Sequence, residues 1–155
     1  MSEVNMPGLF TEMVCSSLET MFFTLPLDLL DPADLPEGAS EGDEIESRLS
    51  FHGTPSGVFH LRISASGARL IAAAFLGEDE DSLSRAEAEQ VICELANMLC
   101  GSMVSRLESD RSIDLSAPEL VPAGTLDVLQ GPFTVCQSFE LERGFLTVSL
   151  RLETA

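Results

Sequence analysis

The chain has 155 residues, which is the usual length of one domain built around one hydrophobic core. Its 26 acidic residues outnumber its 8 basic ones, and the formal net charge of -18 argues against nucleic-acid binding, which depends on Lys and Arg contacts to phosphates. The same charge disfavours an anionic membrane surface, and no apolar run approaches the roughly 20 residues that a bilayer helix needs.

The N-terminal part of the chain is predicted to form a helix followed by an acidic loop. The first residues lack the basic start of a signal peptide, so we expect a cytoplasmic protein. Residues 9–24 place apolar side chains at helical spacing, and Pro26 should end that helix. Residues 28–43 are rich in Asp, Glu, Pro and Gly, which predicts a solvated and mobile loop.

A β-hairpin is predicted next. Residues 45–51 alternate apolar and polar side chains, as do residues 59–63, and the segment between them has the composition of a turn. His52 and His60 lie at this hairpin without a third metal ligand nearby. We therefore expect both histidines to face solvent.

Two helices are predicted after the hairpin. Residues 68–76 should form a short helix that ends at Gly77, a residue suited to a left-handed cap. Residues 78–81 are a run of acids, which is typical of a solvated loop. Ser84 and Glu87 have the spacing of a capping box, and a long helix should follow from there to about Ser109.

The rest of the chain is predicted to be strand. Residues 113–121 form one candidate, which Pro118 assigns to a sheet edge or a bulge. Residues 133–141 and 146–152 alternate as two further strands joined by a tight turn. Because strands and helices are grouped, we expect an α+β fold with an antiparallel or mixed sheet and two long helices packed on one face.

The cysteines do not indicate a metal site. They form no Cys-x-x-Cys pair and no cluster with histidine, so we expect no bound metal and four reduced thiols. They are Cys15, Cys93, Cys100 and Cys136.

The long helix has two contrasting faces. One is a narrow apolar stripe, widened by Leu95, that consists of Ile92, Ala96, Leu99, Met103 and Leu107. The opposite face consists of Gln90, Glu94, Asn97 and Gly101. Asn and Gly are poor helix formers, whereas a face optimised only for solvation would carry Glu, Lys or Ala. An ordinary solvated face remains the alternative to a functional one.

The segment from Glu94 to Gly101 resembles the signature helix of the CheX branch of the CheC/CheX/FliY family of chemotaxis phosphatases. Members of that family carry Glu-x-x-Asn on an exposed helix. The similarity continues, in chain order, through Leu18 to Met21, Gly57 to Leu61, Ala73 to Gly77 and the C-terminal hairpin. This resemblance implies one CheC-like domain over residues 1–155.

The resemblance also implies a function. Members of the family remove the phosphoryl group from the aspartyl phosphate of a receiver domain, chiefly CheY. By this resemblance Asn97 orients the attacking water and Glu94 pairs with the receiver's active-site lysine, while Gln90 and Gly101 contact the partner. The receiver supplies the Mg²⁺, so the chain needs no cofactor of its own, and a homodimer is expected.

One position departs from the family's pattern, since Gln90 stands where the motif has Asp or Ser. Some members also carry a second copy of the catalytic amide on the first helix, where this chain has Phe22. Phe22 is expected in the core, which leaves one active face per chain. Two alternatives remain: a module that docks a receiver without hydrolysis, and a structural, dimeric domain. Nucleophilic catalysis is not supported, because no Ser/His/Asp signature and no glycine-rich phosphate loop occurs.

Overall fold

The computed structural model of the chain describes residues 6–22, 24, 26, 28–30, 44–53, 56–107, 113–122 and 135–152. The helices are α1 (Met6–Met21), α2 (Ala65–Leu76) and α3 (Arg85–Leu107), with a short 3₁₀ turn, η2 (Glu80–Ser82). The strands are β1 (Asp28–Leu30), β2 (Glu44–His52), β3 (Gly57–Ser64), β4 (Asp114–Leu115), β5 (Glu119–Val121), β6 (Val135–Glu140) and β7 (Phe145–Leu152).

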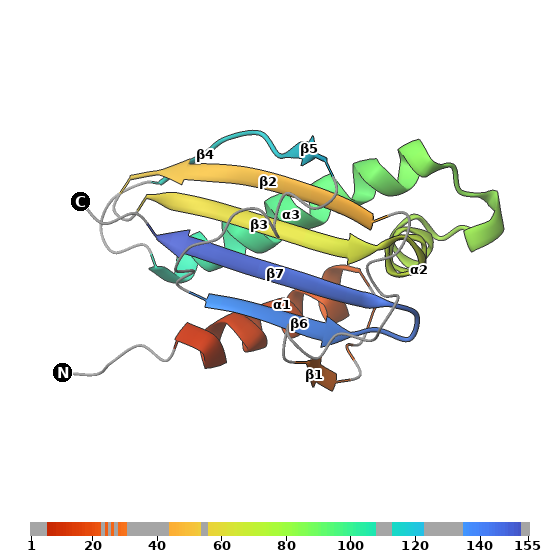
Figure 1. Cartoon of the computed structure of the whole chain (residues 1–155), viewed down its shortest axis with the longest axis horizontal. Helices are drawn as coiled ribbons and strands as arrows, with labels where there is room; N and C mark the ends of the chain where they lie inside the picture. The colour runs from red at the N-terminus through yellow and green to blue at the C-terminus, as the bar shows by residue number, and fades with distance from the viewer. Residues whose placement is uncertain are drawn as a thin grey trace.

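These strands form one antiparallel sheet in the order β1-β6-β7-β3-β2-β4, and β5 also pairs with β2. Helices α1 and α3 cross the same face of the sheet, and α2 lies at one end of it (Figure 1). The predicted α+β fold with helices on one sheet face is therefore confirmed. None of the helices in the described part of the chain combines the length and hydrophobicity that crossing a membrane requires.

The predicted hairpins and caps form for the expected local reasons. Gly77 adopts the left-handed conformation at φ +69° and ends α2, donating its N–H to the carbonyl of Ala73. Helix α2 begins earlier than predicted, at Ala65, because the Ser64 hydroxyl accepts the N–H of Gly67 and caps its first turn. The Ser64 hydroxyl also accepts the N–H of Phe145, which fastens the β6–β7 hairpin to the start of α2.

The two edges of the sheet differ from the prediction. Residues 28–30, predicted to belong to the acidic loop, form β1 and pair with β6 from Asp28 opposite Glu140 to Leu30 opposite Ser138. Residues 31–43 lie outside the described residues. At the other edge, the predicted strand 113–121 is divided into β4 and β5 on either side of Pro118, whose missing N–H cannot join the ladder.

The core lies between the helices and the sheet. Met13 and Leu18 of α1 are buried there, as is Phe22, which directly follows the helix. The Phe22 ring stacks on Phe75 of α2 with 4.8 Å between ring centroids. The expectation that Phe22 belongs to the core is confirmed, so the end of α1 presents an aromatic ring to the interior and no amide to a partner.

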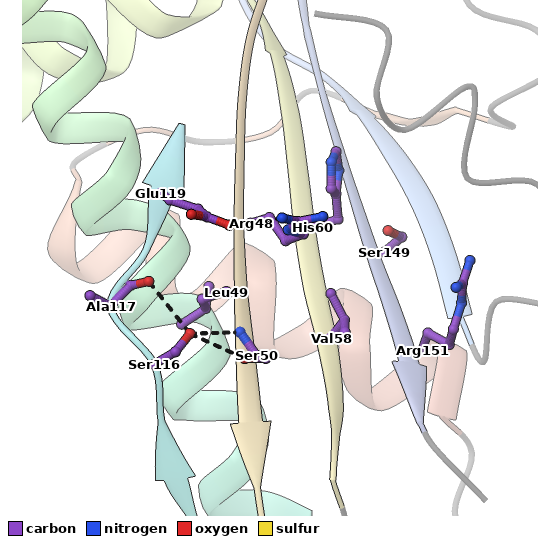
Figure 2. Close-up of a pocket in the computed structure, with 10 residues that line it drawn as sticks. All are labelled: Arg48, Leu49, Ser50, Val58, His60, Ser116, Ala117, Glu119, Ser149 and Arg151. Atoms are coloured by element: carbon purple, nitrogen blue, oxygen red, sulfur yellow. Dashed lines mark hydrogen bonds and ion pairs between the residues drawn. The ribbon is translucent and has the colours of Figure 1, made fainter. Parts of the chain in front are cut away.

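The opposite face of the sheet is polar, and much of it is also buried. Here one prediction is wrong: His52 is exposed as expected, but His60 is only 2% exposed. The reason is its place in the sheet, since β3 is a central strand and His60 lies between Arg48 of β2 and Ser149 of β7 (Figure 2). Alternation alone places a residue on one face of a strand without showing what covers that face.

The burial of His60 changes its chemistry. Desolvation, followed by the positive charges of Arg48 and Arg62, lowers the pKa of His60 to about 4. The Glu46 carboxylate, 3.5 Å from Nε2, acts in the opposite direction. The pKa of His60 is lowered on balance, because burial and two guanidinium groups together outweigh one carboxylate. His60 is therefore neutral at pH 7.

Replacing Phe22 with alanine should destabilise the fold by about 3–5 kcal/mol, because it removes a fully buried ring and its stacking on Phe75. Urea unfolding measures this change. Met21 is the matched control, since its side chain is 41% exposed and Met21→Ala should change stability by less than about 1 kcal/mol. Equal losses in the two variants would contradict the assignment of Phe22 to the core.

The lowered pKa of His60 predicts a specific loss of stability in acid. An unfolded chain binds the proton near pH 6.5, whereas the folded protein binds it only near pH 4, so acid favours unfolding across that window. His60→Gln cannot take up the proton and should lose less stability from pH 7 to pH 4, by an amount on the order of 3 kcal/mol. Urea unfolding as a function of pH tests this, and an equal loss of stability in the wild type and His60→Gln would contradict it.

Candidate functional site

The candidate site lies on α3, whose start is fixed by local hydrogen bonds. The N–H of Glu87 bonds to the Ser84 hydroxyl at 3.1 Å, and the N–H of Ser84 bonds to the Glu87 carboxylate at 3.0 Å. This reciprocal pair is the predicted capping box. Arg85 then donates to the carbonyl of Glu44 at 3.2 Å, which ties the beginning of the helix to β2. The first turn of α3 is thus held against the sheet.

The inner face of α3 contains the predicted apolar stripe and is wider than predicted, since Val91, Cys100 and Val104 are buried as well. Ile92, Ala96, Leu99 and Met103 are each fully buried, and Leu95 widens the stripe as expected. The side chain of Leu107 lies outside those described. Helix α3 packs through this face against β2 and β3 and against both other helices. This burial determines which residues of α3 point away from the core.

The outer face carries the four residues that the sequence singled out. Gln90 and Glu94 are exposed, whereas Asn97 and Gly101 are half-buried. Asn97 is less exposed than predicted because it lies at the margin of the outer face, roughly 20° around the helix axis from the buried Val104. The structure therefore brings all four residues to one side of one helix, with Asn97 at its margin.

The side chains of Glu94 and Asn97 are available for contacts with another molecule. They lie one turn apart, with their Cα atoms separated by about 4.5 Å along the axis. In the described part of the chain, no hydrogen bond or ion pair engages either side chain. A carboxylate only accepts hydrogen bonds, whereas an amide both donates and accepts, so the pair offers two distinct functions on a rigid helix.

Gly101 has no structural explanation within the helix. A Cβ atom built at this position would meet nothing within 4 Å, so packing does not require the absence of a side chain. A glycine inside a helix costs about 1 kcal/mol relative to alanine. The outer face is therefore flatter at Gly101 than stability alone would make it, and open to the close approach of another surface.

Other chemistry on α3 is limited. Burial raises the pKa of the Cys100 thiol to about 12, so this thiol stays protonated and is a poor nucleophile. All four cysteines are free in the structure. Among the described residues, no group of three or more His, Cys, Asp or Glu side chains could hold a metal ion.

The comparisons with known proteins identify a family and a fold. A profile of the family described as "Chemotaxis phosphatase CheX" matches residues 45–138, which include β2, β3, α2, α3 and the candidate site. No curated protein matches the chain.

Several solved structures share the fold. The chemotaxis protein CheX from Vibrio vulnificus is 17% identical, with a TM-score of 0.71 over 99% of both chains. The CheX–CheY–BeF3–Mg complex from Borrelia burgdorferi gives 14% identity and a TM-score of 0.71 over 98% of this chain and 100% of that one. A CheC-like superfamily protein from Shewanella is 18% identical, with a TM-score of 0.69 over 99% of this chain and 100% of that one. With the family profile covering well over half of the sequence, we conclude that the chain belongs to the CheX family of chemotaxis phosphatases.

Proposed function

We propose that this chain removes the phosphoryl group from the aspartyl phosphate of a CheY-type receiver domain in chemotaxis signalling, and that Glu94 and Asn97 act directly in the reaction. The observation that carries the proposal is the position of both side chains, which no other described residue engages, on the outer face of a helix whose other face is buried in the core. Membership of the CheX family supports the same chemistry.

In this proposal Asn97 positions the attacking water. Phosphoryl transfer proceeds in line and depends on positioning and charge stabilisation more than on covalent chemistry by the enzyme. A neutral amide holds a water through one donated and one accepted hydrogen bond, and it adds no negative charge beside the phosphoryl group. A carboxylate in the same place would be repelled by the phosphoryl oxygens.

Glu94 fixes the register of docking. Its carboxylate is exposed, one turn before Asn97, and would pair with the active-site lysine of the receiver. Gln90, one turn earlier, contributes hydrogen bonds to the interface, and Gly101, one turn after Asn97, lets the partner approach the helix closely. The Mg²⁺ required for the reaction is proposed to come from the receiver, so this chain needs no cofactor of its own.

The CheX–CheY complex from Borrelia burgdorferi supports a receiver as the partner, since that related fold is crystallised with CheY. We also propose that the chain forms a homodimer. The exposed side chain of Leu120 on the edge strand β5, at 45% exposure, supports this, because sheet edges with apolar side chains tend to pair.

A second function is favoured by one observation. Gln90 replaces the Asp or Ser of the family motif, which changes the contacts at one end of the outer face and leaves Glu94 and Asn97 intact. A chain altered only there could dock a receiver without hydrolysing its phosphate. The experiments on Asn97 separate this docking module from the phosphatase.

Asn97→Ala should abolish dephosphorylation without unfolding the protein. The amide acts on water in the transition state, so the loss should fall on the maximal rate and not on receiver affinity. Alanine is the better helix former, so thermal stability should be equal or slightly higher. The measurement is phosphate release from an acetyl-phosphate-loaded CheY-type receiver as a function of receiver concentration.

Glu94→Ala is the matched variant one turn away. It should raise the receiver concentration needed for half-maximal rate and lower the rate less severely than Asn97→Ala, because it removes a docking contact. Turnover by Asn97→Ala close to that of the wild type would show that Asn97 does not position water. Wild-type binding without any turnover would favour the docking module.

Gly101→Ala should separate stability from docking. The new methyl group meets open space, so the free protein should gain roughly 0.5–1 kcal/mol in unfolding free energy. The same methyl group should obstruct a closely approaching receiver and weaken its binding. Thermal melts and receiver titrations on this variant test the two effects, and unchanged receiver affinity would remove Gly101 from the interface. Ser105→Ala, at an exposed position one turn further along, is the control.

A further inference from the structure

A cavity lies on the face of the sheet opposite α3. It has a volume of about 470 Å³ and is bounded by residues of β2, β3 and β7 and of the segment that contains β4 and β5 (Figure 2). This volume is in the range of sites that hold small molecules. The sheet separates the cavity from the outer face of α3, so it is distinct from the site proposed for receiver dephosphorylation.

The charge of this cavity is opposite to that of the chain. Arg48 and Arg151 both line it, although the chain has only 8 Lys and Arg residues against 26 acids. Among the described residues that line it, Glu119 is the only acid. Two guanidinium groups beside one carboxylate give a locally positive surface, and guanidinium is the side-chain group best suited to bind carboxylate or phosphate.

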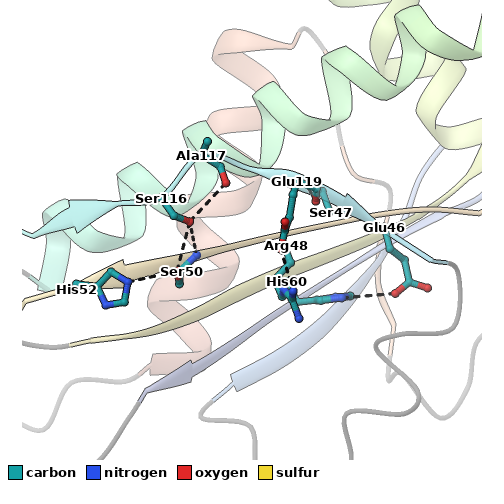
Figure 3. A network of polar contacts seen from close by, with 9 residues as sticks. All are labelled: Glu46, Ser47, Arg48, Ser50, His52, His60, Ser116, Ala117 and Glu119. Atoms are coloured by element: carbon teal, nitrogen blue, oxygen red, sulfur yellow. Dashed lines mark hydrogen bonds and ion pairs between the residues drawn. The ribbon is translucent and has the colours of Figure 1, made fainter.

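His60 supplies a second and independent indication. It lines the cavity at 2% exposure, and within the described part of the chain neither ring nitrogen has a hydrogen-bond partner. The Glu46 carboxylate lies 3.5 Å from Nε2, as an ion-pair contact that does not meet the geometry of a hydrogen bond (Figure 3). A buried polar group without a partner is costly, and a bound oxyanion would satisfy the ring N–H.

Serine hydroxyls complete the polar lining. Ser50 and Ser116 are linked across the strands, since the Ser50 N–H donates to the Ser116 hydroxyl at 2.9 Å. Ser149 lies directly opposite His60 on β7. Hydroxyl groups donate to anionic oxygens, and the half-buried Val58 between them offers apolar surface to the rest of a ligand.

Glu119 is the ion-pair partner of Arg48. The two side chains form an ion pair at 2.8 Å, with exposed fractions of 60% and 40%. Ion pairs this exposed contribute little to stability, so the anionic group of a ligand can displace Glu119 at small cost.

We propose that this cavity binds a small organic anion, whose carboxylate or phosphate group contacts Arg48 and His60 and whose apolar part lies over Val58. The ligand class follows from the positive lining, the unsatisfied buried imidazole and the apolar surface beside them. The cavity and the outer face of α3 lie on opposite sides of the sheet, so binding here does not require a receiver to be present.

The chain provides its own reporter, because His52 and His60 are its only histidines. Side-chain NMR of both rings at pH 7 should be recorded while phenyl phosphate or benzoate is added, with sodium chloride at matched ionic strength as the reference. Saturable movement of the His60 signals by either anion is expected, with a smaller change at His52, whose Nε2 lies 3.5 Å from the hydroxyl of the lining residue Ser50. The anion that binds more tightly identifies phosphate or carboxylate as the preferred group. No saturable movement with either anion would overturn the proposal.

Two variants test the residues. Arg48→Gln should weaken binding about tenfold, because it removes the charged contact. Glu119→Gln frees Arg48 and should strengthen binding about threefold. Arg143→Gln is the matched control, since Arg143 is an exposed arginine that also pairs with one carboxylate, that of Glu80, and it should bind like the wild type. Equal binding by all three variants would overturn the proposal, and thermal melts establish that each is folded.

Discussion

The burial of the apolar face of α3 is the constraint on which the rest of the structure depends. Ile92, Ala96, Leu99 and Met103 are all fully buried, so rotating the helix would expose several of them together. Each such side chain is worth roughly 1.5–3 kcal/mol of burial, with alanine at less. The rotation of α3 is therefore strongly determined. The outer face is turned away from the core as a consequence, which leaves Gln90 and Glu94 exposed and Asn97 and Gly101 half-buried, whatever their own contribution to stability.

This constraint explains why weak helix formers are tolerated on the outer face. Asn97 and Gly101 each cost helix stability, but the helix does not depend on its intrinsic propensity, because packing and the capping box hold it. Because the outer face contributes little to the stability of the helix, it can carry residues that serve contact with another molecule. The same logic separates the site from the fold: substitutions on the outer face alter a surface, whereas substitutions on the stripe alter the core.

Features that depend on neighbouring residues in the chain could be predicted from the sequence. The capping box at Ser84, the left-handed cap at Gly77 and the two faces of α3 are set within a few residues, and the structure has all three. Features that depend on residues far away in the chain could not be predicted from the sequence. The strand at residues 28–30 exists because β6 lies beside it, and nothing in three residues of an acidic segment indicates that partner. The burial of His60 has the same origin, because it depends on what lies over a central strand.

The two faces of the sheet also show why one site could be predicted and the other could not. Glu94 and Asn97 lie three residues apart on one helix, so their spacing alone placed them together. Arg48, His60 and Arg151 come from three different strands and meet only through the register that pairs β2 with β3 and β3 with β7. A signal was nevertheless present, since basic residues are scarce in this chain. Once the strand register is known, Arg48 lies directly opposite His60 and Arg151 directly opposite Val58, which places all of them on one face.

In a chain with a net charge of -18, such local concentration of positive charge opposes the overall field and requires a local explanation. At physiological salt that overall field is screened beyond about 8 Å. An anion that reaches the cavity therefore interacts mainly with the groups that line it, and the charge of the lining decides what binds.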